Sequence, residues 1–235
     1  MRVRVRFAKQ GKVRWTSHRD VARMWERALR RAELPVAYSE GFSPRPRVSF
    51  GLALSTGHES LAEYLDVDLT SDDVDFCTLP ELLTPCLPVG ITAQVAALTG
   101  LRDPSLQQDV TSCTWEIEVV GLAPAEAADA VDRVLESSTL MVTRSRKGTE
   151  STDDIRPAIG ALAVLGATEV GTLLRAELAT QPRSLRPGEL IAAVAPGHDE
   201  GRVLRTHQWI ERDGARREPI PLLATDAPHT ESVCA

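Results

Sequence analysis

The sequence predicts an α+β protein made of two tandem ferredoxin-like units, each with the element order βαββαβ. Short segments that alternate apolar and polar residues recur along the chain, and helical segments with amphipathic spacing or an initial proline separate them. The same order of elements starts again after a polar, proline-containing stretch. The expected domains are a basic first unit over 1–98, a linker over 99–109, a second unit over 110–216 with an insert at 146–166, and a disordered tail over 217–235.

The first unit begins with a strand over residues 2–8. Its apolar side carries Val3, Val5 and Phe7, and its other side carries Arg2, Arg4 and Arg6, which is typical of a half-buried strand. After a turn at Gly11, residues 13–15 are expected to extend this strand.

A helix follows over residues 17–32. Ser17 and Asp20 form a capping-box pattern with Asp in place of Glu, and apolar residues recur every three or four positions from Val21 onward. Pro35 ends the helix because proline cannot continue it.

The remaining elements follow from similar patterns. In the first unit we expect strands over 48–55, 61–69 and 89–98, and a helix between 72 and 83 that Pro80 interrupts. In the second we expect strands over 110–120, 140–145, 168–179 and 202–210, and helices over 124–137 and 187–195. The tail contains two prolines and little periodicity, so we expect it to be disordered.

Positive charge is concentrated at the start of the chain. The first fifty residues hold thirteen Lys/Arg and four Asp/Glu, a net charge of +9, whereas the remaining 185 residues carry −15. The predominance of arginine reflects a compositional bias of the whole chain, so the clustering is the stronger signal. Such a split indicates a basic surface for an anionic partner, most often a nucleic acid.

Other features exclude several classes of protein. No run of about 18 apolar residues occurs, and the first seven residues alternate basic and apolar side chains without the apolar segment of a signal peptide. We therefore expect a cytoplasmic protein that does not enter a membrane. The four cysteines form no C-x-x-C and no zinc-ligand spacing with histidine, so we expect neither a metal nor a cofactor.

Three sequence runs resemble a known family. The runs RWTSHRD (14–20), AYSEGFSPRP (37–46) and EYLDV (63–67), with DIRP (154–157) as a second patch, resemble the radical-SAM-linked protein family, a bacterial domain family of unassigned function. The resemblance implies a link to radical-SAM proteins. This chain lacks the C-x-x-x-C-x-x-C that holds their iron–sulfur cluster, so it resembles a stand-alone form whose radical-SAM partner is a separate protein.

The arginines of the first helix are candidate phosphate contacts, whereas we expect those of the first strand to be neutralised or covered. The helix places several arginines away from its apolar stripe, namely Arg19, Arg23, Arg27, Arg30 and Arg31, with a solvated helix face as the alternative. The strand arginines face the other way. In this fold the first strand neighbours the third, so we expect Asp66 and Asp68 to neutralise them through ion pairs or domain packing to cover them.

The loop over 39–47 is the strongest candidate binding element. Gly41 permits a tight bend, Pro44 and Pro46 stiffen the loop, and the expected contacts are Tyr38, Phe42, Arg45 and Arg47. The alternative places Phe42 in the core and leaves the arginines solvated.

Three further candidates come from the resembling runs. Arg14 and His18 lie beside the N-terminus of the first helix, where His18 has three alternatives: a structural or capping role, anion binding, or general acid–base catalysis. Arg156 is a binding candidate whose alternative is a salt bridge with Asp154.

The sequence supports three hypotheses for function. The first is a non-enzymatic accessory protein that binds RNA and works with a separate radical-SAM enzyme. The second is a metal-independent endoribonuclease with His18 as acid/base. The third is a protein–protein adaptor whose basic face meets an acidic partner. We favour the first, because no spacing marks a second catalytic group beside His18.

Overall fold

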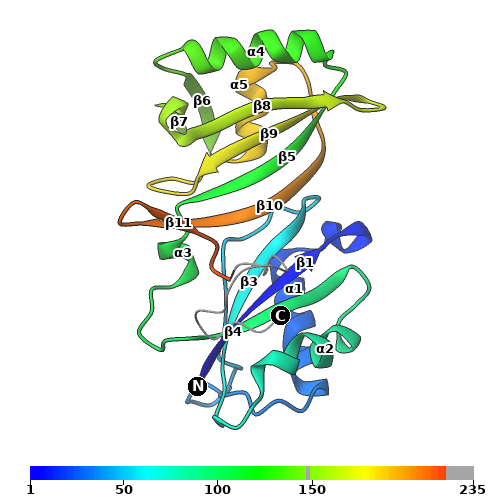
Figure 1. Cartoon of the computed structure of the whole chain (residues 1–235), viewed down its shortest axis with the longest axis vertical. Helices are drawn as coiled ribbons and strands as arrows, with labels where there is room; N and C mark the ends of the chain where they lie inside the picture. Colours follow the sequence, from blue (N-terminus) through cyan, green and yellow to red (C-terminus); the bar gives the residue numbers. More distant parts are fainter. Residues whose placement is uncertain (147–148, 221–235) are drawn as a thin grey trace. The chain divides into compact units, whose positions relative to one another are not determined.

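The computed structural model describes residues 1–146 and 149–220, and these residues form an α+β fold with mostly antiparallel strands and few helices (Figure 1). The chain divides into two compact units. Among the described residues, unit 1 comprises 1–110 and 210–220, and unit 2 comprises 111–209. The predicted α+β class is confirmed.

The sheet of unit 1 is built around β1 (Arg2–Lys9), which pairs on one side with β3 (Glu59–Asp68) and on the other with β4 (Ile91–Thr99). A short strand, β2 (Val48–Phe50), pairs with the far end of β3. All of these pairs are antiparallel. The strand expected over 48–55 is therefore shorter than predicted, because its pairing with β3 ends at Phe50 opposite Leu65.

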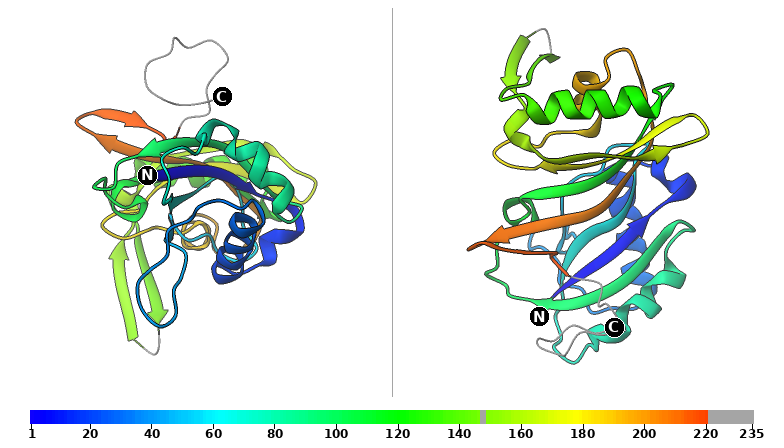
Figure 2. Two further views of the ribbon diagram at one scale, coloured as in Figure 1. Left: turned by 90° about the horizontal axis from the view of Figure 1, so that it is seen from below. Right: turned by 45° about the horizontal axis from the view of Figure 1, so that its top comes forward.

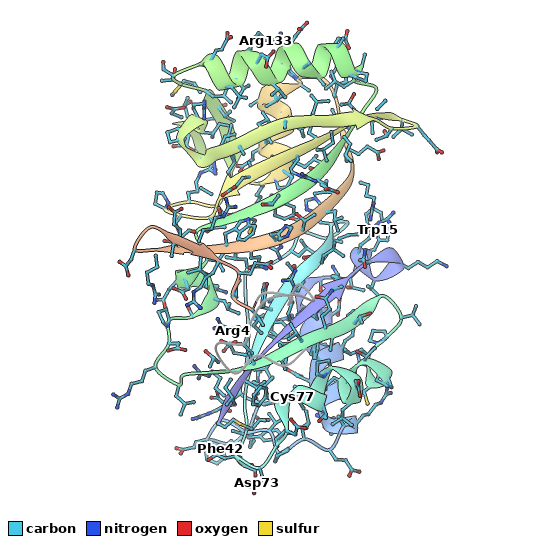
Figure 3. All side chains as sticks on the ribbon, in the orientation of Figure 1. Arg4, Trp15, Phe42, Asp73, Cys77 and Arg133 are labelled. Atoms are coloured by element: carbon cyan, nitrogen blue, oxygen red, sulfur yellow. The ribbon has the colours of Figure 1, made fainter. Side chains whose placement is uncertain are left out.

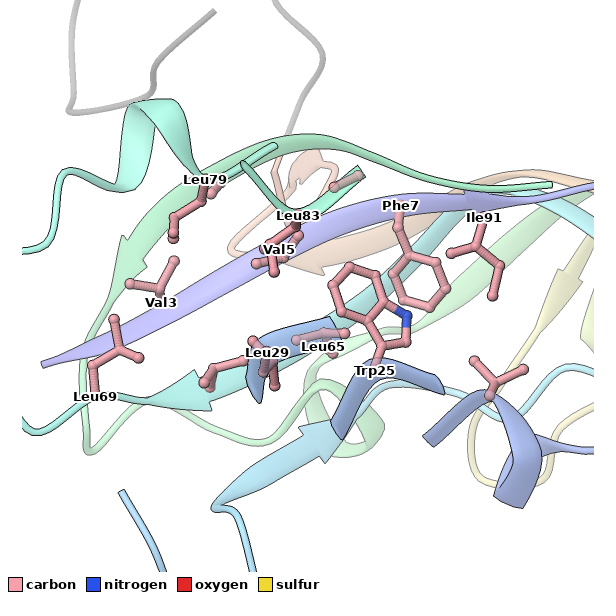
Figure 4. Close-up of a cluster of buried hydrophobic side chains, with 14 of the residues drawn as sticks. Val3, Val5, Phe7, Trp25, Leu29, Leu65, Leu69, Leu79, Leu83 and Ile91 are labelled. Atoms are coloured by element: carbon pink, nitrogen blue, oxygen red, sulfur yellow. The ribbon is translucent and has the colours of Figure 1, made fainter. Parts of the chain in front are cut away.

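One hydrophobic core holds unit 1 together (Figure 4). Helix α1 (His18–Arg31) places Trp25 fully inside this core, where its ring meets Phe7 of β1 edge-on with centroids 4.9 Å apart. Val3 and Val5 are buried in the same cluster, as the alternation of β1 predicts. Helix α2 (Leu79–Leu83) adds Leu79 and Leu83. The arginines of β1 consequently lie on the opposite face of the sheet.

Shorter helical segments complete the first part of the chain. They are η1 (Gly11–Trp15), η2 (Phe76–Thr78), η3 (Thr84–Cys86) and α3 (Leu106–Asp109). Residues 13–15, expected to be extended, thus belong to a 3₁₀ turn.

The segment 99–109, which the sequence assigns to a linker, is folded onto unit 1. Asp103 accepts hydrogen bonds from Gly100 N at 2.7 Å and Thr99 Oγ1 at 2.9 Å. These bonds lower the pKa of Asp103, the one from Gly100 most strongly. Leu106 of α3 is buried, and its Cδ1 lies 3.4 Å from the position that a Cβ on Gly51 would occupy. A buried leucine and a satisfied carboxylate explain why this polar stretch is ordered.

Part of the predicted tail is also ordered. Residues 215–217 form β11 (Ala215–Arg217), which pairs with the end of β10 (Glu200–Arg212). Ile220, within the segment for which the sequence predicts a disordered tail, is buried, and burial of this apolar side chain holds residues 217–220 against unit 1. The rest of the predicted tail, residues 221–235, lies outside the described residues.

Unit 2 is a four-stranded antiparallel sheet with two helices. Its strands are β5 (Ser112–Val120), β8 (Ile159–Ala167), β9 (Gly171–Ala179) and residues 200–209 of β10, in the order β10-β5-β9-β8. The helices are α4 (Pro124–Glu136) and α5 (Pro187–Val194). No helix within residues 1–146 and 149–220 has the length and apolar character needed to cross a membrane.

The middle of unit 2 differs from the prediction. The strand expected over 140–145 corresponds to β6 (Met141–Arg146). Among residues 1–146 and 149–220, β6 pairs with β7 (Thr149–Asp154) alone, and this hairpin stands away from the sheet of unit 2 (Figure 2). The sheet strand is instead β8, which falls in the predicted insert at 146–166 except for its last residue, Ala167. The alternation of β8 is weak because Gly160, Ala161 and Gly166 interrupt it.

Candidate nucleic-acid interface

The arginines of β1 are neutralised by neighbouring carboxylates. The register places Arg2 opposite Asp68 and Arg4 opposite Asp66, and their Nε atoms lie 2.6 and 2.7 Å from carboxylate oxygens. The bond to Asp68 raises the pKa of Arg2. Arg4 is only 7% exposed and makes a second bond of 3.0 Å to Asp66 (Figure 3). The predicted ion pairs are confirmed, and this face offers little free positive charge.

Arg6 is held by a segment that is distant in sequence. Its Nη1 donates to Glu218 Oε2 at 2.8 Å and to the carbonyl oxygen of Ile220 at 3.2 Å. Tyr64 lies beneath the guanidinium, 5.7 Å from ring centroid to Arg6 Cζ. Burial raises the pKa of Tyr64 far above its usual value, so the phenol stays protonated. Because its side chain is only 1% exposed, Tyr64 is not available as a stacking platform on this face.

Helix α1 leaves its arginines in solvent. The Ser17 side chain caps the helix by accepting from Asp20 N at 3.2 Å, and Val21, Trp25, Ala28 and Leu29 form the buried side. The opposite side carries the exposed residues Arg19, Arg23, Arg27, Arg30 and Arg31. Arg19, Arg23, Arg27 and Arg31 follow one another at intervals of four residues, which spaces them along one stripe by about 6 Å each.

Few of these arginines have a carboxylate partner. Arg23 approaches Asp20 at 3.5 Å, and both side chains are about half exposed, so this ion pair is weak. Arg27 Nε donates to the carbonyl oxygen of Arg23 at 3.1 Å, one turn earlier. Within the described part of the chain, Arg19, Arg27, Arg30 and Arg31 make no ion pair. The stripe therefore keeps most of its charge available.

The loop over 38–47 is closed at its base and open at its tip. Ser39 N donates to the carbonyl oxygen of Arg45 at 2.9 Å, and Arg45 N returns a bond of 3.0 Å to Ser39 Oγ. Tyr38 is bridged to Pro46, and Arg47 N donates to Ala37 O at 2.7 Å. These contacts make a narrow, stiff loop that projects from unit 1 (Figure 2).

Phe42 stands at the tip of this loop with its ring entirely in solvent, so the alternative that placed it in the core is wrong. Gly41 before it has a φ of 118°, a conformation that side chains disfavour. Tyr38, Arg45 and Arg47 are also exposed. Neither loop arginine forms an ion pair with a carboxylate of residues 1–146 or 149–220, so charge and an aromatic ring are presented together.

A third exposed element is the end of η1, where the sequence did not predict a surface tryptophan. Trp15, at the end of η1, is 64% exposed, and the guanidinium of Arg14 lies 5.3 Å from its ring centroid. Arg14 also approaches Glu59 Oε1 at 3.5 Å. The alternation of Val13, Arg14 and Trp15 would place the indole ring on the same side as the buried Val13, so no pattern in the sequence marks its exposure. The candidate Arg14 is thus placed beside a surface indole ring.

The turn that carries Trp15 is fixed by buried charged groups. Lys9 is 2% exposed, and its Nζ donates to the carbonyl oxygens of Arg14 and Thr16, each at 3.2 Å. Glu59, also buried, accepts from Gly11 N at 2.7 Å. Hydrogen bonds to charged partners are the stronger kind, so η1 is held rigidly against β1 and β3.

His18 is exposed at the start of α1, where its ring meets Phe50 edge-on at 5.4 Å. It lines a cavity of about 10 Å³ together with Lys9, Glu63 and Tyr64. A cavity of this size holds about one water molecule, whereas pockets for small ligands typically measure about 300 Å³ or more. A larger cavity of unit 1, about 370 Å³ and lined by Arg2, Asp66 and Asp103, does not include His18.

Arg156 belongs to unit 2 and bonds to backbone oxygens. Its guanidinium donates to the carbonyl oxygens of Leu135, Ser137 and Ile159 at 3.3, 3.2 and 3.0 Å. The first two lie at the C-terminal end of α4, where a cation stabilises the helix. Asp154 instead accepts from the backbone N of Arg156 at 3.0 Å. Arg156 therefore ties α4 to β8 rather than forming the expected salt bridge.

A comparison with known protein families gives a match that covers the elements described above. Residues 2–187 match the family described as an uncharacterized protein conserved in bacteria, DUF2344. No curated protein matches the chain. The family match runs from β1 to the first residue of α5 and covers well over half of the sequence, including η1, α1 and the loop over 38–47. The chain belongs to this bacterial family, DUF2344.

Proposed function

We propose that the protein is a non-enzymatic accessory factor that binds RNA through unit 1, on a surface formed by α1 and the loop over 38–47. The observation that carries this proposal is the contrast between two sets of arginines. The arginines of β1 form ion pairs with Asp66, Asp68 and Glu218, whereas those of α1 and the loop are exposed to solvent. Unpaired exposed arginines favour phosphate binding, since each contact releases counterions from the nucleic acid.

The loop and the helix belong to one region of unit 1. The chain leaves α1 at Arg31, and Val36 at the base of the loop bridges to Leu69. Leu29 of α1 and Leu69 belong to the core cluster against which Val36 and Val48 pack. The two basic elements thus share a rigid support, and an RNA strand is able to contact both.

We further propose that each unit is ferredoxin-like. In unit 1 the order β4-β1-β3 with β2 on β3, and in unit 2 the order β10-β5-β9-β8, follow the pairing expected of a βαββαβ element order. RNA-binding modules of this architecture commonly use the open face of the sheet. Here that face is neutralised in unit 1, which favours the helical side instead.

A catalytic alternative is less well supported. His18 is the only sequence candidate for an acid/base, and its cavity is too small for a nucleotide. The endoribonuclease hypothesis predicts RNA cleavage in EDTA that disappears in His18→Ala. We expect no cleavage by either protein, assayed on total RNA by gel electrophoresis.

The proposed partner is a separate radical-SAM enzyme in the cytoplasm. The resemblance of residues 14–20 and 37–46 supports this, together with the lack of an iron–sulfur C-x-x-x-C-x-x-C in the chain. Affinity purification with and without nuclease tests it. A radical-SAM protein retained after nuclease treatment indicates direct contact, and its loss indicates an RNA bridge.

The RNA proposal is tested by charge reversal in a filter-binding titration. Arg23→Glu/Arg27→Glu is expected to weaken RNA binding at least tenfold and to reduce the slope of log K against log salt by about 1.4, for two contacts to a single strand. The matched control is Arg102→Glu/Arg133→Glu, which makes the same charge change at exposed positions outside α1 and the loop (Figure 3). Equal losses in both variants contradict a specific surface on α1.

A further inference from the structure

Three aromatic side chains of unit 1 are exposed although the sequence has few aromatic residues: Tyr38 is about half exposed, and Trp15 and Phe42 are more so. Trp15 is 64% exposed and Phe42 entirely exposed. An exposed indole or phenyl ring forgoes the stabilisation that burial of its apolar surface would give. Such rings are commonly found where a ligand covers them.

The two rings are carried by the segments that precede and follow α1 in the sequence. Trp15 precedes the N-cap Ser17 by two residues, so it stands at the N-terminal end of the helix. After the C-terminal end of α1 the chain passes Val36, which bridges to Leu69, and then enters the loop over 38–47 that carries Phe42. Figure 3 accordingly shows Trp15 and Phe42 toward opposite ends of unit 1. The stripe from Arg19 to Arg31 covers about 18 Å of helix axis, at 1.5 Å per residue.

The Trp15 ring is held in place before any ligand binds, whereas for Phe42 it is the loop backbone that is closed. The Trp15 ring is contacted by Arg14 and lies 3.0 Å from the position that a Cβ on Gly57 would occupy. Gly57 N in turn donates to the carbonyl oxygen of Arg14 at 2.8 Å, the oxygen that Lys9 also binds. Phe42 is presented by the closed loop described above, between Gly41 and the prolines. The fixed Trp15 ring therefore loses little conformational entropy on binding.

A double helix offers these aromatic rings no free base face on which to stack. Bases in a double helix are stacked on one another and leave no face for an outside ring, whereas single-stranded bases stack readily on aromatic side chains. Arginines spaced along a helix suit the phosphates of the strand that joins those bases. On the basis of the proposed function, we propose that the RNA bound by unit 1 is single-stranded, with bases stacked on Trp15 and Phe42 and phosphates paired with the α1 stripe.

Fluorescence anisotropy with two probes tests this inference on the full chain. The probes are a labelled single-stranded 12-nucleotide RNA of mixed sequence and the same RNA annealed to its complement, at equal salt. We expect the single strand to bind at least tenfold more tightly. Trp15→Ala and Phe42→Ala are each expected to weaken that binding by about five- to a hundredfold.

Two controls separate stacking from a general loss of structure. Val89→Ala removes a different exposed apolar side chain and is expected to leave binding unchanged. Trp15→Phe keeps an aromatic ring and should retain most of the affinity. Added single strand should also quench tryptophan fluorescence in the wild type, and this quenching should be lost in Trp15→Phe.

The outcomes distinguish this inference from the function on which it rests. Equal binding of both probes, or unchanged affinity in both alanine variants, overturns the single-strand inference while charge reversal on α1 still reports RNA binding. Failure of the wild type to bind either probe overturns RNA binding itself, and the inference with it. The protein–protein hypothesis for the same surface would then gain support.

Discussion

The ammonium group of Lys9 donates a hydrogen bond to the carbonyl oxygen of Arg14 at 3.2 Å. Lys9 is the last residue of β1 and is buried, while the side chain of Arg14 lies against the exposed ring of Trp15. One bond therefore connects the interior of unit 1 to the edge of the proposed RNA surface. The positive charge of Lys9 is used for structure, unlike that of the α1 arginines.

Replacing this ammonium tests its structural role. Lys9→Met keeps the length of the side chain but removes the donor to the oxygens of Arg14 and Thr16. We expect a loss of about 1–3 kcal/mol in the free energy of unfolding, measured by urea denaturation. Lys12→Met, at an exposed position of the same turn, should change it by less than about 0.5 kcal/mol. Equal effects of the two variants would contradict the assigned role.

The buried pair of Arg4 and Asp66 gives a second prediction. Asp66→Ala leaves a guanidinium buried without its carboxylate and is expected to destabilise the protein by about 3–5 kcal/mol. The double variant Arg4→Met/Asp66→Leu should recover most of this loss, because it removes the charge as well.

The control for this prediction is the more exposed cross-strand pair of Glu116 and Arg175 in unit 2. Glu116→Ala is expected to cost less than about 1 kcal/mol in the same urea experiment. A double variant no more stable than Asp66→Ala would show that the pair is not coupled as the geometry indicates.

The helix cap of α1 gives a prediction for pH. The Ser17 hydroxyl donates to Asp20 at 2.7 Å and lowers the pKa of that carboxyl. Because the pKa in the folded state is depressed, the contribution to stability is present above the unfolded pKa of about 3.9 and is lost as pH falls through the folded value. Ser17→Ala should raise the pKa of Asp20, observed by NMR titration of its side-chain carbon. An unchanged pKa would show that another group sets it.

Replacing Arg156 tests whether this candidate residue has a structural role or a binding role. Arg156→Met removes three bonds to carbonyl oxygens and is expected to lower the free energy of unfolding by about 1.5–3 kcal/mol. RNA affinity should stay within twofold of the wild type at a temperature where both proteins are folded. A large loss of affinity by filter binding would place Arg156 in the interface after all.

Local patterns predicted much of the fold. The alternation of β1 identified its core face, and the position of the third strand beside it identified Asp66 and Asp68 as ion-pair partners. The capping pattern at Ser17 placed the start of α1. These features depend on residues close in sequence or on strand order, which periodicity reports well.

The features that the sequence did not predict depend on distant contacts. Glu218 meets Arg6 across 212 positions of the chain, and no local pattern indicates that pair. Trp15 is exposed because the buried groups of Lys9 and Glu59 hold a 3₁₀ turn where an extended segment was expected. β8 was missed because its small residues weaken the alternation that marks a strand.

The most direct test of the account is ultraviolet crosslinking of the full chain to single-stranded RNA, with the crosslinked peptides identified by mass spectrometry. We predict crosslinks within residues 14–31 and 38–47, reduced by Arg23→Glu/Arg27→Glu and unaffected by Arg102→Glu/Arg133→Glu. Crosslinks confined to unit 2 or to the face of β1 and β3 that carries Arg4 would contradict the proposed surface.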